Sequence, residues 1–136
     1  MVRSVVVMEM KLELVAVPVT DIDRAKEFYV QVGFVADHDY TVSDDIRFVQ
    51  LTPPGSGCSI TVGKGLTDMA PGSLDNMQMV VADADAARAD LLARGIDVSE
   101  VDDQPWGRFV YFSDPDGNGW ALQQLPDWAP GAATGA

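Results

Sequence analysis

The chain has 136 residues, of which 47% are hydrophobic and 22% charged, proportions typical of one globular domain. Its formal net charge of −12 argues against nucleic acid as a partner, because that binding requires clustered Lys and Arg, and it disfavours anionic membrane surfaces. The segment before Lys11 is too short, and through Glu9 too polar, for a membrane span or a signal peptide. A single cysteine, Cys58, excludes an intramolecular disulfide and suits a reducing compartment, so we expect a cytoplasmic protein.

The sequence repeats itself at an offset of 62 residues. Residues 19–34 align without a gap with residues 81–96, and Val, Asp, Asp, Ala and Gly occupy the same places in both copies. Each copy is typical of a strand, a capped helix, a Gly stop and a new strand. The repeat therefore predicts two similar modules, and a surface shared by the two modules is a place for a ligand.

The first module begins with a predicted strand over 11–19. Thr20 and Asp23 form a capping-box-like start for a helix that ends at Gly33. The apolar residues on one face of this helix are Ile22, Ala25, Tyr29 and Val32. Strands are expected at about 34–42, 46–52 and 58–63, which gives the order βαβββ.

The second module repeats this order after a connector. We predict a strand over 74–81, a helix over 83–94 and strands near 96–101, 108–113 and 119–125. Residues 114–118 form a tight turn in which Gly117 or Asn118 adopts a positive φ, and Trp120 faces the helices as core. The chain is thus expected to be one domain of two modules, about 11–63 and 74–125, with connector 64–73 and a loose tail at 126–136.

Three stretches carry a family resemblance: the Pro-Val-x-Asp-x-Asp-Arg-Ala-x-x-Phe-Tyr pattern at 18–29, the helix at 83–95, and the Asp-Pro-Asp-Gly-Asn turn within 112–118. In this order and spacing they resemble the vicinal oxygen chelate superfamily, which includes glyoxalase I, extradiol dioxygenases and bleomycin-resistance proteins. The resemblance spans roughly residues 11 to 125. It implies an α+β fold in which paired βαβββ modules form a cupped mixed sheet. It also implies a homodimer, because bleomycin-resistance proteins are dimers whose binding groove lies between subunits.

The metal site of that superfamily is expected to be lost here. Its ligands occupy four equivalent inner positions, which the resemblance carries to Leu14, Thr61, Asn76 and Ala121. A catalytic divalent ion needs imidazole or carboxylate ligands, and none of the four positions has one. The only histidine, His38, lies in an Asp-His-Asp run typical of an exposed strand edge. We therefore predict no metal at the inherited site and no other cofactor.

The cup lining follows from the alternation of side chains along a strand. It is expected to be mostly apolar and neutral, and the family resemblance implies that Trp106 and Arg108 lie near its rim. The candidate ligand-binding residues are Leu14, Ser59, Thr61, Asn76, Gln78, Trp106, Arg108, Tyr111, Ala121 and Gln123. Alternatives stay open, because Asn76 and Gln78 equally suit hydrogen bonds to backbone or water, and Trp106 equally suits a core edge or a subunit contact.

Three functions are compatible with this lining. The first is a metal-free protein that binds a small organic molecule between its modules, for sequestration of an antibiotic or toxin. The second is a metal-independent isomerase or cyclase of secondary metabolism, in which Tyr111, a rim Asp or a group from a dimer partner supplies the acid or base. The third is a metal-dependent glyoxalase- or dioxygenase-like lyase with a relocated site. The sequence assigns no catalytic residue and leaves open whether the protein is an enzyme.

Overall fold

The computed structural model describes residues 7–128 and shows two modules, each with one helix and four strands. The elements of the first module are β1 (Leu14–Ala16), α1 (Ile22–Val32), β2 (Val35–Ser43), β3 (Ile46–Thr52) and β4 (Ser59–Lys64). Those of the second are β5 (Met77–Val80), α2 (Ala84–Ala93), β6 (Asp102–Gln104), β7 (Gly107–Ser113) and β8 (Gly119–Gln124). The predicted tail at 126–136 lies outside the described residues from position 129 onward.

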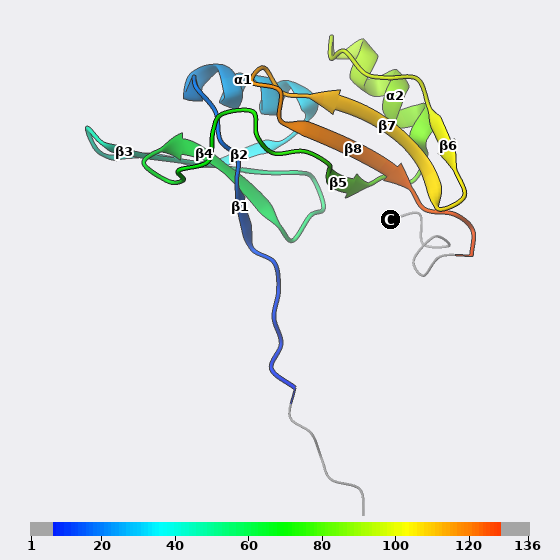
Figure 1. The fold of residues 1–136 in the computed structure, drawn as a ribbon, viewed down its shortest axis with the longest axis horizontal. Coiled ribbons are helices and arrows are strands. Elements are labelled where there is room, and N and C mark those ends of the chain that lie inside the picture. The colour runs from blue at the N-terminus through cyan, green and yellow to red at the C-terminus, as the bar shows by residue number, and fades with distance from the viewer. Residues whose placement is uncertain (1–6, 129–136) are drawn as a thin grey trace, which may run out of the picture.

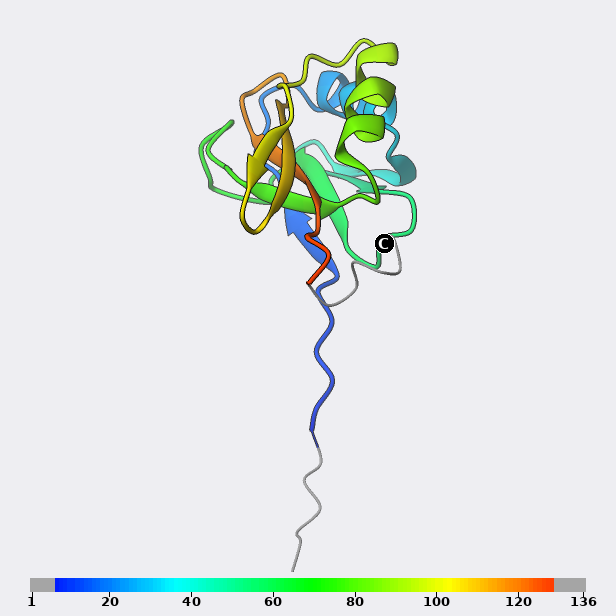
Figure 2. The same ribbon diagram turned by 90° about the vertical axis from the view of Figure 1, so that its right-hand side faces the viewer.

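The two sheets have the same strand order, β1-β4-β3-β2 and β5-β8-β7-β6. In each sheet the first strand of the module pairs in parallel with the last, and the other pairs are antiparallel. This arrangement confirms the α+β class with paired βαβββ modules. Figure 1 shows the two sheets beside each other with α1 and α2 on one side, and Figure 2 shows the two helices next to each other from a second direction.

The two helices begin in the same way, as the repeat predicts. The side chain of Asp21 accepts a hydrogen bond from the backbone N–H of Arg24 at 3.0 Å, and Asp83 does the same for Ala86 at 3.1 Å. These caps satisfy backbone donors that the first helical turn leaves free. The predicted start at Thr20 was therefore one residue early. The prediction that α1 stops at Gly33 is confirmed, because this residue has φ +126° and its N–H bonds to the last turn.

The strand predicted near 96–101 is absent, and the ladder begins at Asp102 instead. The backbone of Ile96 is used elsewhere, because its N–H donates to Leu91 and completes the end of α2. Ser99 N–H then donates to Tyr111 at the edge of β7, but continuous pairing with β7 starts only three residues later.

One hydrophobic core joins the modules. Ala25 and Tyr29 of α1 are fully buried, and Leu91 of α2 belongs to the same cluster of packed side chains. Both sheets contribute to it; the strand residues in the cluster include Val49, Leu51, Val62, Val110, Phe112, Trp120 and Leu122. The two modules therefore share one core, and the prediction that Trp120 faces the helices is confirmed.

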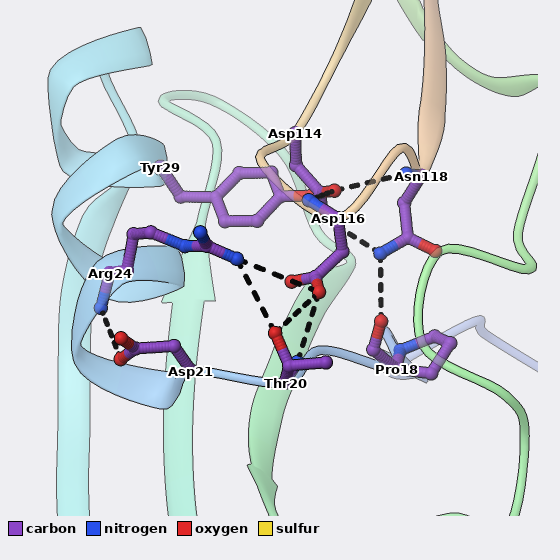
Figure 3. A network of polar contacts seen from close by, with 8 residues as sticks. All are labelled: Pro18, Thr20, Asp21, Arg24, Tyr29, Asp114, Asp116 and Asn118. Carbon is purple, nitrogen blue, oxygen red and sulfur yellow. Dashed lines mark hydrogen bonds and ion pairs between the residues drawn. The ribbon is translucent and has the colours of Figure 1, made fainter.

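A buried polar network ties α1 to the β7–β8 turn (Figure 3). The hydroxyl of Tyr29 donates to the carboxylate of Asp114 at 2.8 Å and accepts a hydrogen bond from the indole N–H of Trp120 at 2.9 Å. The amide of Asn118 donates to Asp114 and to the carbonyl of Pro18, both at 2.8 Å. Tyr29 and Asn118 are fully buried and Asp114 is 5% exposed, so water does not reach their polar atoms. Each hydrogen bond of the network therefore satisfies a group that would otherwise lack a partner.

A second contact at the surface extends this junction. Asp116, in the same turn, accepts hydrogen bonds from the backbone N–H and the hydroxyl of Thr20, at 3.2 and 2.7 Å. Arg24 lies 3.7 Å from the same carboxylate. Thr20 thus connects the entry of α1 to the second module, rather than capping its own helix.

Replacing Tyr29 with Phe should lower the free energy of unfolding by about 1–3 kcal/mol. The change leaves the ring in place but removes the hydroxyl that Trp120 and Asp114 share, so two buried polar groups lose a partner. Urea unfolding followed by tryptophan fluorescence measures this loss. Tyr40→Phe is the matched control, because Tyr40 is 59% exposed and should change stability little. Equal stability of both variants would contradict a stabilising contribution of the Tyr29 hydrogen bonds.

The same tyrosine should make the fold sensitive to alkali. Burial, and then the neighbouring Asp114 carboxylate, raise the pKa of Tyr29 well above its ordinary value of about 10. The folded state therefore holds this proton more tightly than the unfolded state does. Its contribution to stability is complete below pH 10 and is lost as the pH rises above that value. The urea concentration at the unfolding midpoint should decrease more between pH 9 and pH 11 in the native sequence than in Tyr29→Phe. An equal decrease in both proteins would refute the assignment of this pH dependence to Tyr29.

Candidate functional site

Each sheet has one face toward the helices and a second face, which we call the open face. On the first sheet, Leu14 stands opposite Ser59 and Ala16 opposite Thr61, whereas the alternate residues, such as Val17, point into the core. The open-face residues of the first sheet are Leu14, Ala16, Gln50, Thr52, Ser59 and Thr61. Those of the second sheet are Gln78, Val80, Phe109, Tyr111, Ala121 and Gln123.

A row of side-chain hydrogen bonds crosses the open face of the first sheet. The amide of Gln50 donates to the hydroxyl of Ser59 at 3.1 Å, and that hydroxyl lies 2.6 Å from the hydroxyl of Thr52. Thr52 in turn donates to the carboxylate of Asp37. The hydroxyl of Thr61 is buried and has no hydrogen-bond partner within residues 7–128. It is therefore the polar group of this face that remains for water or a ligand.

Tyr111 is the most prominent polar group on the open face of the second sheet. Its hydroxyl donates to the carboxylate of Asp102 at 2.8 Å, and its ring stacks on Phe109 at a centroid distance of 6.1 Å. Partial burial, and then the hydrogen bond to Asp102, raise the pKa of Tyr111. The phenol thus keeps its proton at neutral pH. Beside it, the amide of Gln123 donates to the backbone carbonyl of Trp106 at 3.1 Å.

An acidic cleft of about 750 Å³ opens at the end of the second sheet, next to Tyr111. Its lining residues are Asp75, Asn76, Asp97, Val98, Ser99, Tyr111, Phe112, Ser113, Gly119 and Trp120. This set contains two carboxylates and no Lys or Arg. Gly119 makes room for one of them, because a Cβ at that position would lie 2.5 Å from the carboxylate oxygen of Asp75. The cleft combines negative charge, aromatic surface and neutral hydrogen-bonding groups.

A second cleft of similar volume, about 750 Å³, lies between the modules and follows β5. Gln78 and Val80 contribute to its wall, and the turn between β3 and β4 lies across from them at Pro53. The amide of Gln78 donates to the side-chain oxygen of Asn76 at 3.2 Å, so this pair connects the edges of the two clefts. Asn76 has φ +59°, a left-handed backbone that Asn tolerates, and it precedes β5 instead of lying within it as the sequence analysis supposed.

The structure distributes the predicted ligand-binding residues over these surfaces. Leu14, Ser59 and Thr61 lie together on the first open face. The second open face and its clefts hold Asn76, Gln78, Tyr111, Ala121 and Gln123. Thr61 stands opposite Ala16 and Ala121 opposite Gln78, and these two partners are 62 positions apart. Thr61 and Ala121 are therefore equivalent positions of the two modules.

One of the two predicted rim residues, Arg108, is not brought to the open face. Arg108 points toward the helix side, where its guanidinium binds Asp85 of α2 at 2.8 Å and Asp103 of β6 at 2.6 Å. The cause is the alternation of β7, which sends Tyr111 and Arg108 to opposite faces. Trp106 lies in the β6–β7 turn and is 57% exposed.

Three acidic residues in or beside the cleft were not predicted from the sequence: Asp75 and Asp97 line it, and Asp102 binds Tyr111 next to it. Asp97 reaches the cleft because the segment after α2 crosses the end of β7, and Asp102 meets Tyr111 only once β6 and β7 have paired. The spacing of residues along the sequence does not predict such contacts between segments that become neighbours only in the fold. The one available signal was the excess of Asp between 97 and 103 in a stretch otherwise expected to be a strand.

The four positions inherited from the metal site hold Leu14, Thr61, Asn76 and Ala121, a set that offers one hydroxyl and one amide. Such side chains do not fit a divalent metal. In the part of the chain that the structure describes, no group of three or more His, Cys, Asp and Glu is placed to hold a metal ion. None of the helices in residues 7–128 has the length and apolar character needed to cross a membrane.

Comparison with known proteins places the chain in a family. Among solved structures, TnmS3, an antibiotic binding protein from Streptomyces sp. CB03234, is 37% identical over 88% of this chain and 99% of its own, with a TM-score of 0.79. A glyoxalase/bleomycin resistance protein from the same organism is 39% identical over 84% of this chain and 100% of its own, with a TM-score of 0.73.

A third structure, from Sphaerobacter thermophilus DSM 20745, is 29% identical over 86% of this chain and 98% of its own, with a TM-score of 0.73. No curated protein matches the chain. The model of the Glyoxalase/Bleomycin resistance protein/Dioxygenase superfamily matches residues 11–122. The chain belongs to this superfamily, as its paired modules and its sequence motifs both indicate.

Proposed function

We propose that this protein binds a small organic molecule, an antibiotic or a toxin, without a metal ion and thereby sequesters it. The observation that carries the proposal is the acidic cleft beside Tyr111, together with the open face that adjoins it. The cleft offers carboxylates, aromatic surface and hydrogen-bonding groups, which suit binding and orientation. The four inherited metal positions offer no strong ligand, so the bound molecule would be held by side chains without a metal ion.

The ligand class follows from the charges around the cleft. Asp75 and Asp97 lie in its wall, Asp102 lies next to it, and no cationic side chain lines it. An overall charge of −12 adds a negative field that attracts cations. Phe112 and Trp120 supply apolar surface. We therefore expect a partly apolar cation with a few hydrogen-bonding groups.

The similarity to TnmS3 supports this proposal, because that protein is described as antibiotic binding and its identity to this chain is 37%. We further propose a homodimer in the cytoplasm, with one domain of two modules at about 11–63 and 74–125. The single cysteine supports a reducing compartment, and the shared core of the two modules supports one domain.

A metal-independent isomerase is the second candidate, and the hydrogen bond between Tyr111 and Asp102 favours it. Because the pKa of Tyr111 is raised, its phenol stays protonated at neutral pH and is a weak acid. In such a reaction Tyr111 would keep its proton and orient a bound substrate by hydrogen bonding. A pure binding protein returns its ligand unchanged, whereas an isomerase returns a new compound, so chromatography of the released molecule separates the two functions.

Asp97→Asn should weaken binding of a cationic ligand about 2- to 5-fold, because it removes one exposed charge from the cleft. Calorimetric titration with metal-free bleomycin, a cationic antibiotic, at low and at high salt measures the effect. The loss should shrink at high salt, since salt screens surface charges. Asp68→Asn is the matched control, because Asp68 is exposed and lines neither cleft. Unchanged bleomycin binding in Asp97→Asn, or no binding by the native protein, would count against the cationic ligand class.

Protein purified without added metal should hold far less than one divalent ion per chain and should carry any retained ligand as an organic mass. Elemental analysis and native mass spectrometry of one sample measure both. The reason is the donor set at the inherited positions, which lacks imidazole and carboxylate. Stoichiometric zinc, nickel or iron would refute the metal-free proposal and favour a metal-dependent lyase with a relocated site.

A further inference from the structure

Tyr111 is held at its backbone and at its ring, beside the acidic cleft. Its backbone N–H donates to the hydroxyl of Ser99 at 2.9 Å, and its carbonyl accepts a hydrogen bond from the backbone N–H of Ser99, also at 2.9 Å. Its ring stacks on that of Phe109, with 4° between the ring planes. The side chain is 40% exposed and lines the cleft, so a bound molecule can reach its hydroxyl.

The proton of this hydroxyl has a fixed destination within the protein. The hydroxyl donates to one carboxylate oxygen of Asp102 at 2.8 Å, and the other oxygen of Asp102 accepts a hydrogen bond from the amide of Gln104 at 2.9 Å. Asp102 stands opposite Phe109 in the β6–β7 ladder, so its side chain lies on the same face as Tyr111. Gln104 follows two residues later on that face and holds the carboxylate in place.

A ligand competes poorly for this proton. Hydrogen bonds to a carboxylate are charge-assisted and are stronger than those to a neutral oxygen. A ligand carbonyl or ether oxygen would have to take the proton from Asp102, and the carboxylate would lose a partner. A ligand N–H meets no such obstacle, because the oxygen of a phenol that donates its proton can still accept a hydrogen bond. Toward a ligand, Tyr111 is therefore an acceptor.

The groups near Tyr111 have the same polarity. The hydroxyl of Ser99 donates its proton to the backbone carbonyl of Glu100 at 2.8 Å, so this proton is also used within the protein. Asp75 and Asp97, in the wall of the same cleft, are carboxylates and can only accept.

Two other side chains of the cleft, Asn76 and Ser113, carry groups that can donate. The selection therefore acts on the ligand atom that meets Tyr111, and not on every polar atom of the ligand.

We propose that Tyr111 is a specificity-determining residue of the cleft, which accepts a hydrogen bond from a ligand N–H and, through Asp102, disfavours ligands that place a carbonyl or ether oxygen at this point. This inference rests on the proposed binding function. It narrows the ligand class from a partly apolar cation to one whose amino or amidinium N–H faces Tyr111. Asp102 and Gln104 are positioning residues, because they act through the hydroxyl of Tyr111.

Two aromatic cations with the same skeleton and the same charge test this rule. The 3,6-diamino-10-methylacridinium ion carries N–H donors, and the 3,6-dimethoxy-10-methylacridinium ion carries ether oxygens in their place. Fluorescence titration of the full chain measures a dissociation constant for each ion. The ratio of the two constants cancels the general attraction of an acidic cleft for a cation. The native protein should bind the diamino ion about 3- to 10-fold more tightly, the factor that one hydrogen bond provides.

Three variants identify the groups responsible. Tyr111→Phe should lower the ratio about 3- to 10-fold, because the acceptor is lost while the ring remains. Asp102→Leu should also lower it, because the released hydroxyl can donate to an ether oxygen. Asp103→Leu is the matched control. It removes the same charge from the adjacent residue, but Asp103 binds Arg108 on the helix side, so the ratio should stay at its native value.

Each result has a distinct meaning, and urea unfolding of every variant verifies that it is folded. A native ratio that persists in Tyr111→Phe would overturn the selection by Tyr111 and leave the proposed binding of cations standing. A ratio that falls in Tyr111→Phe but persists in Asp102→Leu would overturn the part assigned to Asp102. A native protein that binds neither ion would overturn both the proposed ligand class and the selection at Tyr111.

Discussion

The hydrogen bonds of Tyr29 with Asp114, drawn in Figure 3, and with Trp120 are the contact on which the arrangement of the two modules depends. Tyr29 belongs to the first module, and its two partners flank the turn that starts the last strand of the second. Asn118 closes the network by binding both Asp114 and the end of the first strand region at Pro18. These groups are buried, so a change in the position of one module would leave polar atoms without partners. The network thereby fixes which faces of the sheets pack together and which stay open.

The open faces inherit their chemistry from this constraint. Since the helices cover one face of each sheet, the alternate residues of every strand form the other face, where Thr61 and Ala121 occupy equivalent positions. In this chain those positions carry small or neutral side chains, and the negative charge is placed at the margin instead, on Asp75, Asp97 and Asp102. Under the proposed function, a neutral floor with an acidic margin suits a cationic ligand.

The repeat allowed much of the fold to be predicted, because it fixes element order independently of local propensity. The helix starts at Asp21 and Asp83 show this, although the first was placed one residue early. The strand expected at 96–101 does not form for a local reason. Ile96 lies in the core, and its backbone N–H completes the end of α2. The spacing of apolar residues in this stretch predicts a strand, but it contains no information about backbone groups that are already hydrogen-bonded to α2.

The sequence by itself determined the paired modules and the family. It also determined which residues of β4 and β8 face the core, because apolar residues at a period of two identify the buried face of a strand. It could not determine which polar side chains meet. Arg108 and Tyr111 are three residues apart, yet one binds Asp85 of the helix and the other binds Asp102 on the open face. Only the tertiary structure decided this. Such contacts arise when separate strands and loops pack side by side, and no spacing along one chain records the distance between two of its segments.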